Sequence, residues 1–481
     1  MDERVKKRLR HGLDMIRKDD ERLERIDRYA RGRQAAPFLP RKSNPEFRDL
    51  AKRAINNLIP LIVDAPVNAM NVDGYKRSTG EGVADEWKVW SRNRLDERQS
   101  HVHRAALETG QAFVSVLPDP ADPGRPAIRG HHPITFSATY RDPAFDQFPI
   151  YTVEVEYDTE TPHSTSRAIV KARYIDSRQA IDFEFRRSES EPVVLAVNKH
   201  GLGVCPVVRF APQLDLRGRT MGLIEPIMTM QDRINQVQLN QLIAQHYTSF
   251  AIRYATGLAP VPLLDENGNE QYTEDGHLKV IPPVIDPSTM LVSADPNTKF
   301  GSIDGASTKD MQDSIEQAIR HMCMVTQTPP TYLLGQMANL SADALAASEQ
   351  AFMRRVSEIQ SNFGEAWALV LRLCALIAGD RDGFEDQDSL IMWADKGNRS
   401  LAQSADAGLK LTQMGVPPEI VLRKMPGFTE SDIEEAVKLM EEQREEQQLI
   451  DKLTAAMSPP KGDPNAAGNA AAKKPSSARA A

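Results

Sequence analysis

The sequence predicts an α+β protein that is predominantly helical and divided into several modules. Aromatic residues make up only 6% of the 481 residues, which suits helical packing better than an all-β core. Strand-like segments with alternating apolar and polar residues gather between residues 112 and 197. Long stretches with helical periodicity lie on both sides of them, and the chain is long enough for several small cores.

The overall charge argues against a protein that binds nucleic acid through a basic surface. The net charge is −8, so we expect such a chain to handle DNA by enclosing it rather than by binding its phosphates. Its three cysteines, Cys205, Cys323 and Cys374, lie far apart and form no CxxC pair. This pattern predicts buried thiols in a reducing compartment, with neither a disulfide framework nor a zinc site.

The N-terminal sequence MDERVKKRLR has no apolar core of the kind found in signal peptides. No apolar run approaches the roughly 20 residues that cross a bilayer. We therefore expect a protein that does not enter membranes and that is made in a cytoplasm.

Residues 1–33 predict a pair of amphipathic helices with charged outer faces. Acidic and basic residues alternate closely in this segment, which favours a solvated, salt-bridged surface over a DNA-binding one. Apolar residues recur at roughly helical spacing, at Val5, Leu9, Leu13, Ile16, Leu23 and Ile26.

The region 45–215 predicts a mixed module. Helical patterns surround residues 51–62 and 84–110, and Gly110 is a candidate C-cap. Pro- and Asp-rich residues 118–126 predict a turn between strands. The strand-like runs cover residues 112–117, 150–157, 168–174, 180–185 and 193–197.

A helix rich in uncharged amides is predicted after Gly222, with Pro226 in its first turn. The surface of a lone monomer usually carries charges at such positions. The amides favour lateral packing against copies of the same helix, although an ordinary polar face explains them nearly as well. The amides assigned to such contacts are Gln231, Asn235, Gln238 and Gln241.

Residues 251–306 predict a small β-rich insert between this helix and a second helix at 309–326. Turn signals separate its short strands at Asn267-Gly268, Asp275-Gly276 and Pro282-Pro283. The apolar stripe of the second helix predicts packing along one side.

The segment 326–378 is the most informative part of the chain. Pro329 and Pro330 end the preceding helix, and Ser341 is a plausible N-cap for the next one. That next helix has an apolar stripe up to residue 378 and would span about 55 Å. Since the stripe lacks regular heptads, a ring of neighbouring subunits fits it better than a strict coiled coil.

Several motifs, in this order and spacing, resemble the portal proteins of siphovirus-type tailed phages, especially phages of actinobacteria. They are Trp87, Trp90, NRLD at 93–96, AALETGQAFV at 105–114, GVCPVVRF at 203–210, GLIEPIMTMQDRIN at 222–235, TPPTYLLG at 328–335, NLSADA at 339–344 and GVPPEIVLRKMPGF at 415–428. The resemblance covers most of the chain and implies a portal fold of wing, stem, clip and crown that assembles as a ring.

On this resemblance the chain divides into eight parts. They are N-terminal helices and wing (1–220), first stem helix (221–250), clip (251–306), second stem helix (307–327), tunnel loop (328–341), long wing helix (342–380), helical crown (381–456) and disordered tail (457–481).

The expected tunnel loop carries no charge between Thr328 and Ser341. Each cation–phosphate contact adds affinity, so an uncharged loop suits DNA that must slide. We expect Gln336, Met337 and Asn339 to approach the duplex; an ordinary loop between two helices is the alternative.

The resemblance implies a ring, typically of twelve copies, at one capsid vertex of the virion, assembled in the host bacterial cytoplasm. The partners it implies are the major capsid protein, scaffold protein, the terminase large subunit, head–tail adaptor proteins and double-stranded DNA that passes without sequence specificity.

The sequence offers no catalytic residues, no metal site and no cofactor site. It lacks a P-loop and a nucleophile elbow, and His131-His132 predicts a loop pair without further ligands. Two alternatives stay open at this point. One is another phage head component, such as a minor capsid or scaffold-associated protein; the other is a metal-dependent nuclease.

Overall fold

The computed structural model divides the chain into two units, Met1–Lys396 and Gly397–Ala481. The structure describes residues 2–41, 45–78, 86–157, 169–185, 191–249, 253–256, 261–265, 267–273, 276–281, 298–302, 308–335, 342–394, 401–423, 425 and 430–457.

The first unit begins with one long helix, α1 (Glu3–Ala30), whose N-terminus is capped by the Asp2 side chain. The expected pair of helices is wrong, because the helix continues through Gly12. This glycine faces the neighbouring sheet so closely that a Cβ would lie 2.4 Å from Cγ2 of Val153. Gly12 therefore permits close packing and does not break the helix.

A five-stranded antiparallel sheet packs against the first half of α1, with the strand order β4-β5-β6-β7-β8. All four strands predicted in this region are confirmed, and β4 is additional. Val153, Tyr174 and Phe183 face α1 and are fully buried, as the alternation predicts. The strands are β4 (Phe136–Thr139), β5 (Tyr151–Tyr157), β6 (Ile169–Asp176), β7 (Gln179–Glu184) and β8 (Val193–Lys199).

A second, three-stranded antiparallel sheet has the order β3-β2-β9. Its strands are β2 (Ala112–Asp119), β3 (Asp122–His131) and β9 (Val207–Phe210). The predicted strand at 112–117 is confirmed. The turn predicted at 118–126 is present but shorter, covering residues 120 and 121 between Asp119 and Asp122. The second half of the predicted turn, from Asp122, starts β3, and Pro126 pairs with Pro118 across the hairpin. Pro126 is tolerated because β3 is an edge strand, and Pro118 lies beyond residues 112–115, the part of β2 that pairs with β9.

The helical patterns around this sheet are each divided into two helices. Residues 45–69 form α2 (Pro45–Arg53) and α3 (Ile59–Ala69), and residues 86–109 form α4 (Glu86–Arg92) and α5 (Leu95–Thr109). Arg94 separates α4 from α5 with a left-handed φ of 55°. Gly110 ends α5 with a φ of 94°, which confirms the predicted C-cap.

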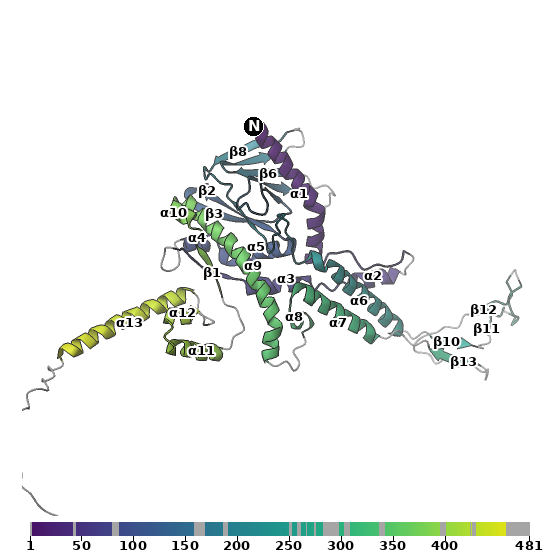
Figure 1. Cartoon of the computed structure of the whole chain (residues 1–481). Helices are drawn as coiled ribbons and strands as arrows, with labels where there is room; N and C mark the ends of the chain where they lie inside the picture. The colour runs from purple at the N-terminus through teal and green to yellow at the C-terminus, as the bar shows by residue number, and fades with distance from the viewer. Residues whose placement is uncertain are drawn as a thin grey trace, which may run out of the picture. The chain divides into compact units, whose positions relative to one another are not determined.

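The amide-rich helix α6 (Met228–Ser249) follows a short 3-10 turn, Glu225–Ile227, that contains Pro226. It lies beside α7 (Thr308–Thr326) and, on another side, beside α2 (Figure 1). The insert between α6 and α7 contains two short antiparallel pairs, β10 (Arg253–Thr256) with β13 (Lys299–Ser302) and β11 (Val261–Pro262) with β12 (Val280–Ile281). Gly268 and Gly276 adopt the positive φ expected of the turns, whereas Pro282 and Pro283 lie outside the described residues.

The short helix α8 (Pro330–Leu334) precedes the long helix α9 (Ala342–Ile377), whose 36 residues confirm the overlong helix predicted from the sequence. Phe363 and Trp367 of α9 are completely buried in the largest core, which also contains residues of α3, α5, β2 and β9. The predicted N-cap Ser341 lies outside the described residues.

The chain continues in the first unit after α9. Helix α10 (Arg381–Glu385) packs on α9, and β14 (Leu390–Trp393) pairs with β1 (Val72–Lys76). Arg77 forms ion pairs with Glu86 and Asp380. Residues 381–394, expected to begin the crown, therefore pack within the first unit.

The second unit contains α11 (Leu401–Gln413), α12 (Pro418–Arg423) and α13 (Glu430–Met457). The expected disordered tail, beyond Met457, lies outside the described residues. All three cysteines are buried free thiols, as predicted. Among the described helices, none combines the length and apolar character needed to span a bilayer.

Candidate functional site

The amide side chain of Gln231 is enclosed by its own chain. Its Oε1 accepts a hydrogen bond from the backbone N–H of Leu58 at 3.1 Å, and its Nε2 donates to the carbonyl of Asn56 at 2.6 Å. Nε2 also donates to Oδ1 of Asn235 at 2.9 Å, and this oxygen accepts from the N–H of Asn56 at 3.1 Å. The two amides thus satisfy backbone groups of the connection between α2 and α3.

This arrangement corrects part of the sequence interpretation of α6. Gln231 is 0% exposed and Asn235 is 1% exposed, so neither side chain can contact another copy. A charge on either of these buried side chains would be costly, and their uncharged amides hold the connection between α2 and α3 of the same subunit. Gln238 and Gln241 are only half-buried.

An N-terminal strap, defined as residues 22–41 and 45–58, contacts α6 and the turn that precedes it at several points. Arg22 forms an ion pair with Glu225 at 2.8 Å. The hydroxyl of Tyr29 donates to the Asp232 carboxylate at 2.8 Å, and burial together with this hydrogen bond raises the pKa of Tyr29 to about 12. These contacts join segments about 200 residues apart in the chain.

The junction between α7 and α8 is strained but well bonded. Gln327 has a positive φ of 54°. On either side of it, Thr326 Oγ1 donates to the carbonyl of Met322 at 2.9 Å, and the Thr328 N–H donates to the carbonyl of Cys323 at 3.0 Å. The chain therefore turns sharply from α7 into α8, as the double proline predicts. The expected DNA-facing residues Gln336, Met337 and Asn339 lie outside the described residues.

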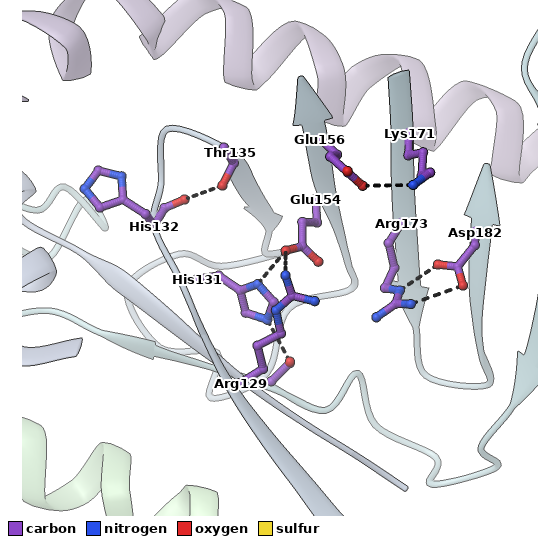
Figure 2. Close-up of polar contacts among 10 residues, drawn as sticks. Arg129, His131, His132, Thr135, Glu154, Glu156, Lys171, Arg173 and Asp182 are labelled. Atoms are coloured by element: carbon purple, nitrogen blue, oxygen red, sulfur yellow. Dashed lines mark hydrogen bonds and ion pairs between the residues drawn. The ribbon is translucent and has the colours of Figure 1, made fainter. Parts of the chain in front are cut away.

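A polar cluster connects the two sheets (Figure 2). His131 places Nε2 2.7 Å from Oγ of Ser115 and Nδ1 3.0 Å from Oε1 of Glu154, while Arg129 lies 3.4 Å from the same oxygen. Burial pushes the pKa of Glu154 upward. The hydrogen bond from His131 and the nearby positive charges outweigh burial, so the pKa of Glu154 lies below its usual value.

The Ser115–His131–Glu154 distances match those of a serine hydrolase triad, but the backbone does not. Ser115 lies in β2, the central strand of its sheet, so the backbone N–H groups of this strand pair with β3 and β9. No pair of free N–H groups is available there as an oxyanion hole. We interpret the cluster as a structural contact that joins the two sheets.

The same cluster corrects the assignment of His131 to a loop, because it is the last residue of β3. Two other carboxylates on this face of the sheet are also paired with cations: Asp182 with Arg173 at 2.6 Å, and Glu156 with Lys171 at 3.5 Å. Within the described part of the chain, no group of three or more His, Cys, Asp or Glu residues could hold a metal ion.

Comparison with known proteins identifies the family. The model of the family described as phage portal protein, SPP1 Gp6-like, matches residues 13–449. The chain belongs to this family of phage portal proteins. The match spans both units, from α1 to α13, and confirms the α+β portal fold implied by the sequence motifs.

Two portal proteins of mycobacteriophages are similar to this chain. Those of Mycobacterium phage D29 and Mycobacterium phage L5 are each 25% identical over 399 residues, which cover 80% of this chain and 78% of each relative. Two solved structures also align. The neck of an empty GTA particle, computed with C6 symmetry, has a TM-score of 0.41 at 13% identity and covers 82% of this chain and 99% of its own. The neck of a native GTA particle, computed with C12 symmetry, has a TM-score of 0.40 at 11% identity, with coverage of 82% and 94%.

Sequence reasoning located the helices of this portal protein but missed how α6 is held. The strap residue Phe38 hydrogen-bonds through its backbone to Gln236, an amide that sequence analysis did not single out. No local sequence pattern predicts the hydrogen bond between Phe38 and Gln236, because the two residues lie 198 positions apart.

Proposed function

We propose that the chain forms the ring-shaped channel through which DNA enters and leaves the capsid, at one vertex of the virion. The pair of helices α6 and α7, joined by a β insert and followed by a charge-free segment and the long helix α9, carries this proposal. A helix of 36 residues has more length than one small domain needs, and neighbouring copies of α9 can cover the rest. Family membership over residues 13–449 supports the same function.

In this proposal the segment 328–341 faces the duplex, with Gln336, Met337 and Asn339 nearest to it. Uncharged side chains allow DNA of any sequence to slide, because no phosphate is held by a cation. The half-buried amides Gln238 and Gln241 remain candidates for contact between neighbouring copies.

The ring would contain twelve copies and would bind the capsid and scaffold proteins, the terminase large subunit and then the head–tail adaptors. We propose no catalytic activity, metal or cofactor for the chain itself. The pairing of the carboxylates around Glu154 supports this, since each of them already has a cationic partner.

Lysine substitutions in the segment 328–341 test the proposed channel surface. We expect Gln336→Lys and Asn339→Lys to leave ring assembly intact and to slow DNA packaging, measured as the DNA content of heads over time. Gln413→Lys, at an exposed amide of α11, is the matched control. Unchanged packaging by rings that carry both loop lysines would contradict the assignment.

A further inference from the structure

The aromatic side chain of Phe38 is exposed to solvent, although the backbone that carries it is restricted. It is 77% exposed and lies between Pro37 and Pro40 in the extended part of the strap. Proline fixes φ and limits the conformations of the residue before it. The local sequence therefore reduces the freedom of this segment.

Contacts with α6 fix the Phe38 backbone further. Its N–H donates to Oε1 of Gln236 at 2.9 Å, and its carbonyl accepts from Nε2 of the same side chain at 3.4 Å. The next residue, Leu39, packs against the small core formed by Ala51, Ala54 and Leu239. The chain therefore anchors the Phe38 backbone and the next residue, Leu39, and leaves the Phe38 ring 77% exposed.

Such an arrangement is what a binding anchor requires. Aromatic residues dominate the energy of many interfaces, and a side chain that is already positioned loses less entropy on binding. Within its own subunit, the fixed position of Phe38 contributes no burial of the ring, because the subunit leaves that ring exposed.

A second exposed apolar surface lies on the other side of α6. Helix α7 buries Ile315, Ile319 and Met322. Met324 is two residues beyond Met322, which at 100° per residue places it on the opposite face of α7, where it is 74% exposed. The neighbouring Val325 is 45% exposed.

The two surfaces lie on different flanks of one helix. Helix α6 is flanked by α2, which is part of the strap, and by α7 (Figure 1). A ring of identical subunits is built from head-to-tail contacts, in which two different surfaces of the same chain meet. A protein with one anchor on each flank meets this requirement.

We propose that Phe38 of one copy packs against the outward face of α7 around Met324 of the next copy. This inference rests on the proposed ring and names the residues that close it. A methionine thioether and an aromatic ring attract each other and adapt in shape. The occupant of the Phe38 surface is therefore a second copy of this chain.

Assembly of the full-length protein tests the proposal. Phe38→Ala and Met324→Ala are compared with Phe145→Ala and Met414→Ala, whose side chains are 73% and 79% exposed. Particle masses are measured over a range of protein concentrations. We expect each of the first two variants to raise the concentration for half-assembly by about tenfold or more, as loss of an interface anchor does. Both controls should assemble like the wild type.

Unfolding of the unassembled subunit provides the second readout. Because both side chains are exposed, Phe38→Ala and Met324→Ala should leave its melting temperature unchanged, and the double variant should assemble about as poorly as the worse single variant. Normal ring assembly by Phe38→Ala overturns the inference while the proposed channel stands. If Phe38→Ala forms normal rings that fail to enter virions, Phe38 binds another protein, and the proposed contact between copies is again overturned. If the wild-type chain forms no rings, the proposed function fails as well.

Discussion

The indole Nε1–H of Trp367 donates a hydrogen bond to Nε2 of His103 at 2.9 Å, and this bond attaches the long helix α9 to α5. Both side chains are 0% exposed. The His103 ring stacks on Phe363 with centroids 5.0 Å apart, and Trp367 packs edge-on against Trp90 at 4.8 Å. This aromatic cluster holds α9 against α4 and α5.

Removing the indole donor should weaken that attachment. Trp367→Phe leaves Nε2 of His103 buried without a partner, which costs about 1–3 kcal/mol. We expect denaturant unfolding of the unassembled subunit to show this loss. Adding His103→Leu should recover part of it, because the orphaned nitrogen is then gone. Strictly additive losses in the double variant would argue against a direct bond.

The stability of the first unit should fall in acid because of His103. Burial lowers the pKa of His103 to about 3 from its ordinary value of 6.5. Between these values the unfolded chain binds a proton that the folded chain does not, so stability is full above pH 6.5 and declines as the pH falls toward 3. One such group contributes a slope of up to about 1.4 kcal/mol per pH unit. Unfolding measured from pH 7 to 4 should show a shallower slope for His103→Leu than for the wild type.

The hydrogen bonds of Gln231 and Asn235 with residues 56–58, called here the amide lock, should stabilise the single subunit. Gln231→Leu removes the hydrogen-bond partner of the buried Leu58 N–H, at a cost of about 1–3 kcal/mol. The carbonyl of Asn56, an exposed residue, also loses its partner. Gln238→Leu is the matched control on the same helix, and we expect it to change the melting temperature of the unassembled subunit little. Equal stability of the two variants would mean that the lock does not form.

The close contact between the start of the α6 segment and the end of α5 should tolerate no side chain. A Cβ on Gly222 would lie 2.4 Å from the carbonyl oxygen of Glu108, and the next residue, Leu223, donates to the carbonyl of Leu107 at 2.7 Å. Gly222→Ala should therefore destabilise the subunit by about 1–3 kcal/mol or more. Gly124→Ala, where a Cβ meets only the Asp122 side chain at 3.7 Å, should be neutral in the same thermal unfolding experiment.

Local patterns in the sequence predicted much of this fold. The alternation along β5 and the apolar stripe of α9 reflect burial on one face, so both elements were found from their periodicity. The strand β3 was missed because Pro123, Gly124 and Pro126 favour a turn, and only pairing with β2 makes this segment a strand. The break at Arg94 was missed for a similar reason, since a positive φ at arginine is imposed by its surroundings.

The candidate site was harder to predict than the fold. The amides of α6 stood out correctly as unusual, but the sequence could not show that Gln231 and Asn235 bond to residues 56–58 of the same chain. Hydrogen bonds between segments more than 170 residues apart leave no local signal. The roles of Gln336, Met337 and Asn339 stay a prediction.

Electron microscopy of the purified full-length protein tests the central claim most directly. The account predicts closed rings whose central hole is wide enough for a DNA duplex, with the segment 328–341 of every copy facing that hole. A protein that stays monomeric at all concentrations, or rings whose hole is lined by other parts of the chain, would contradict it.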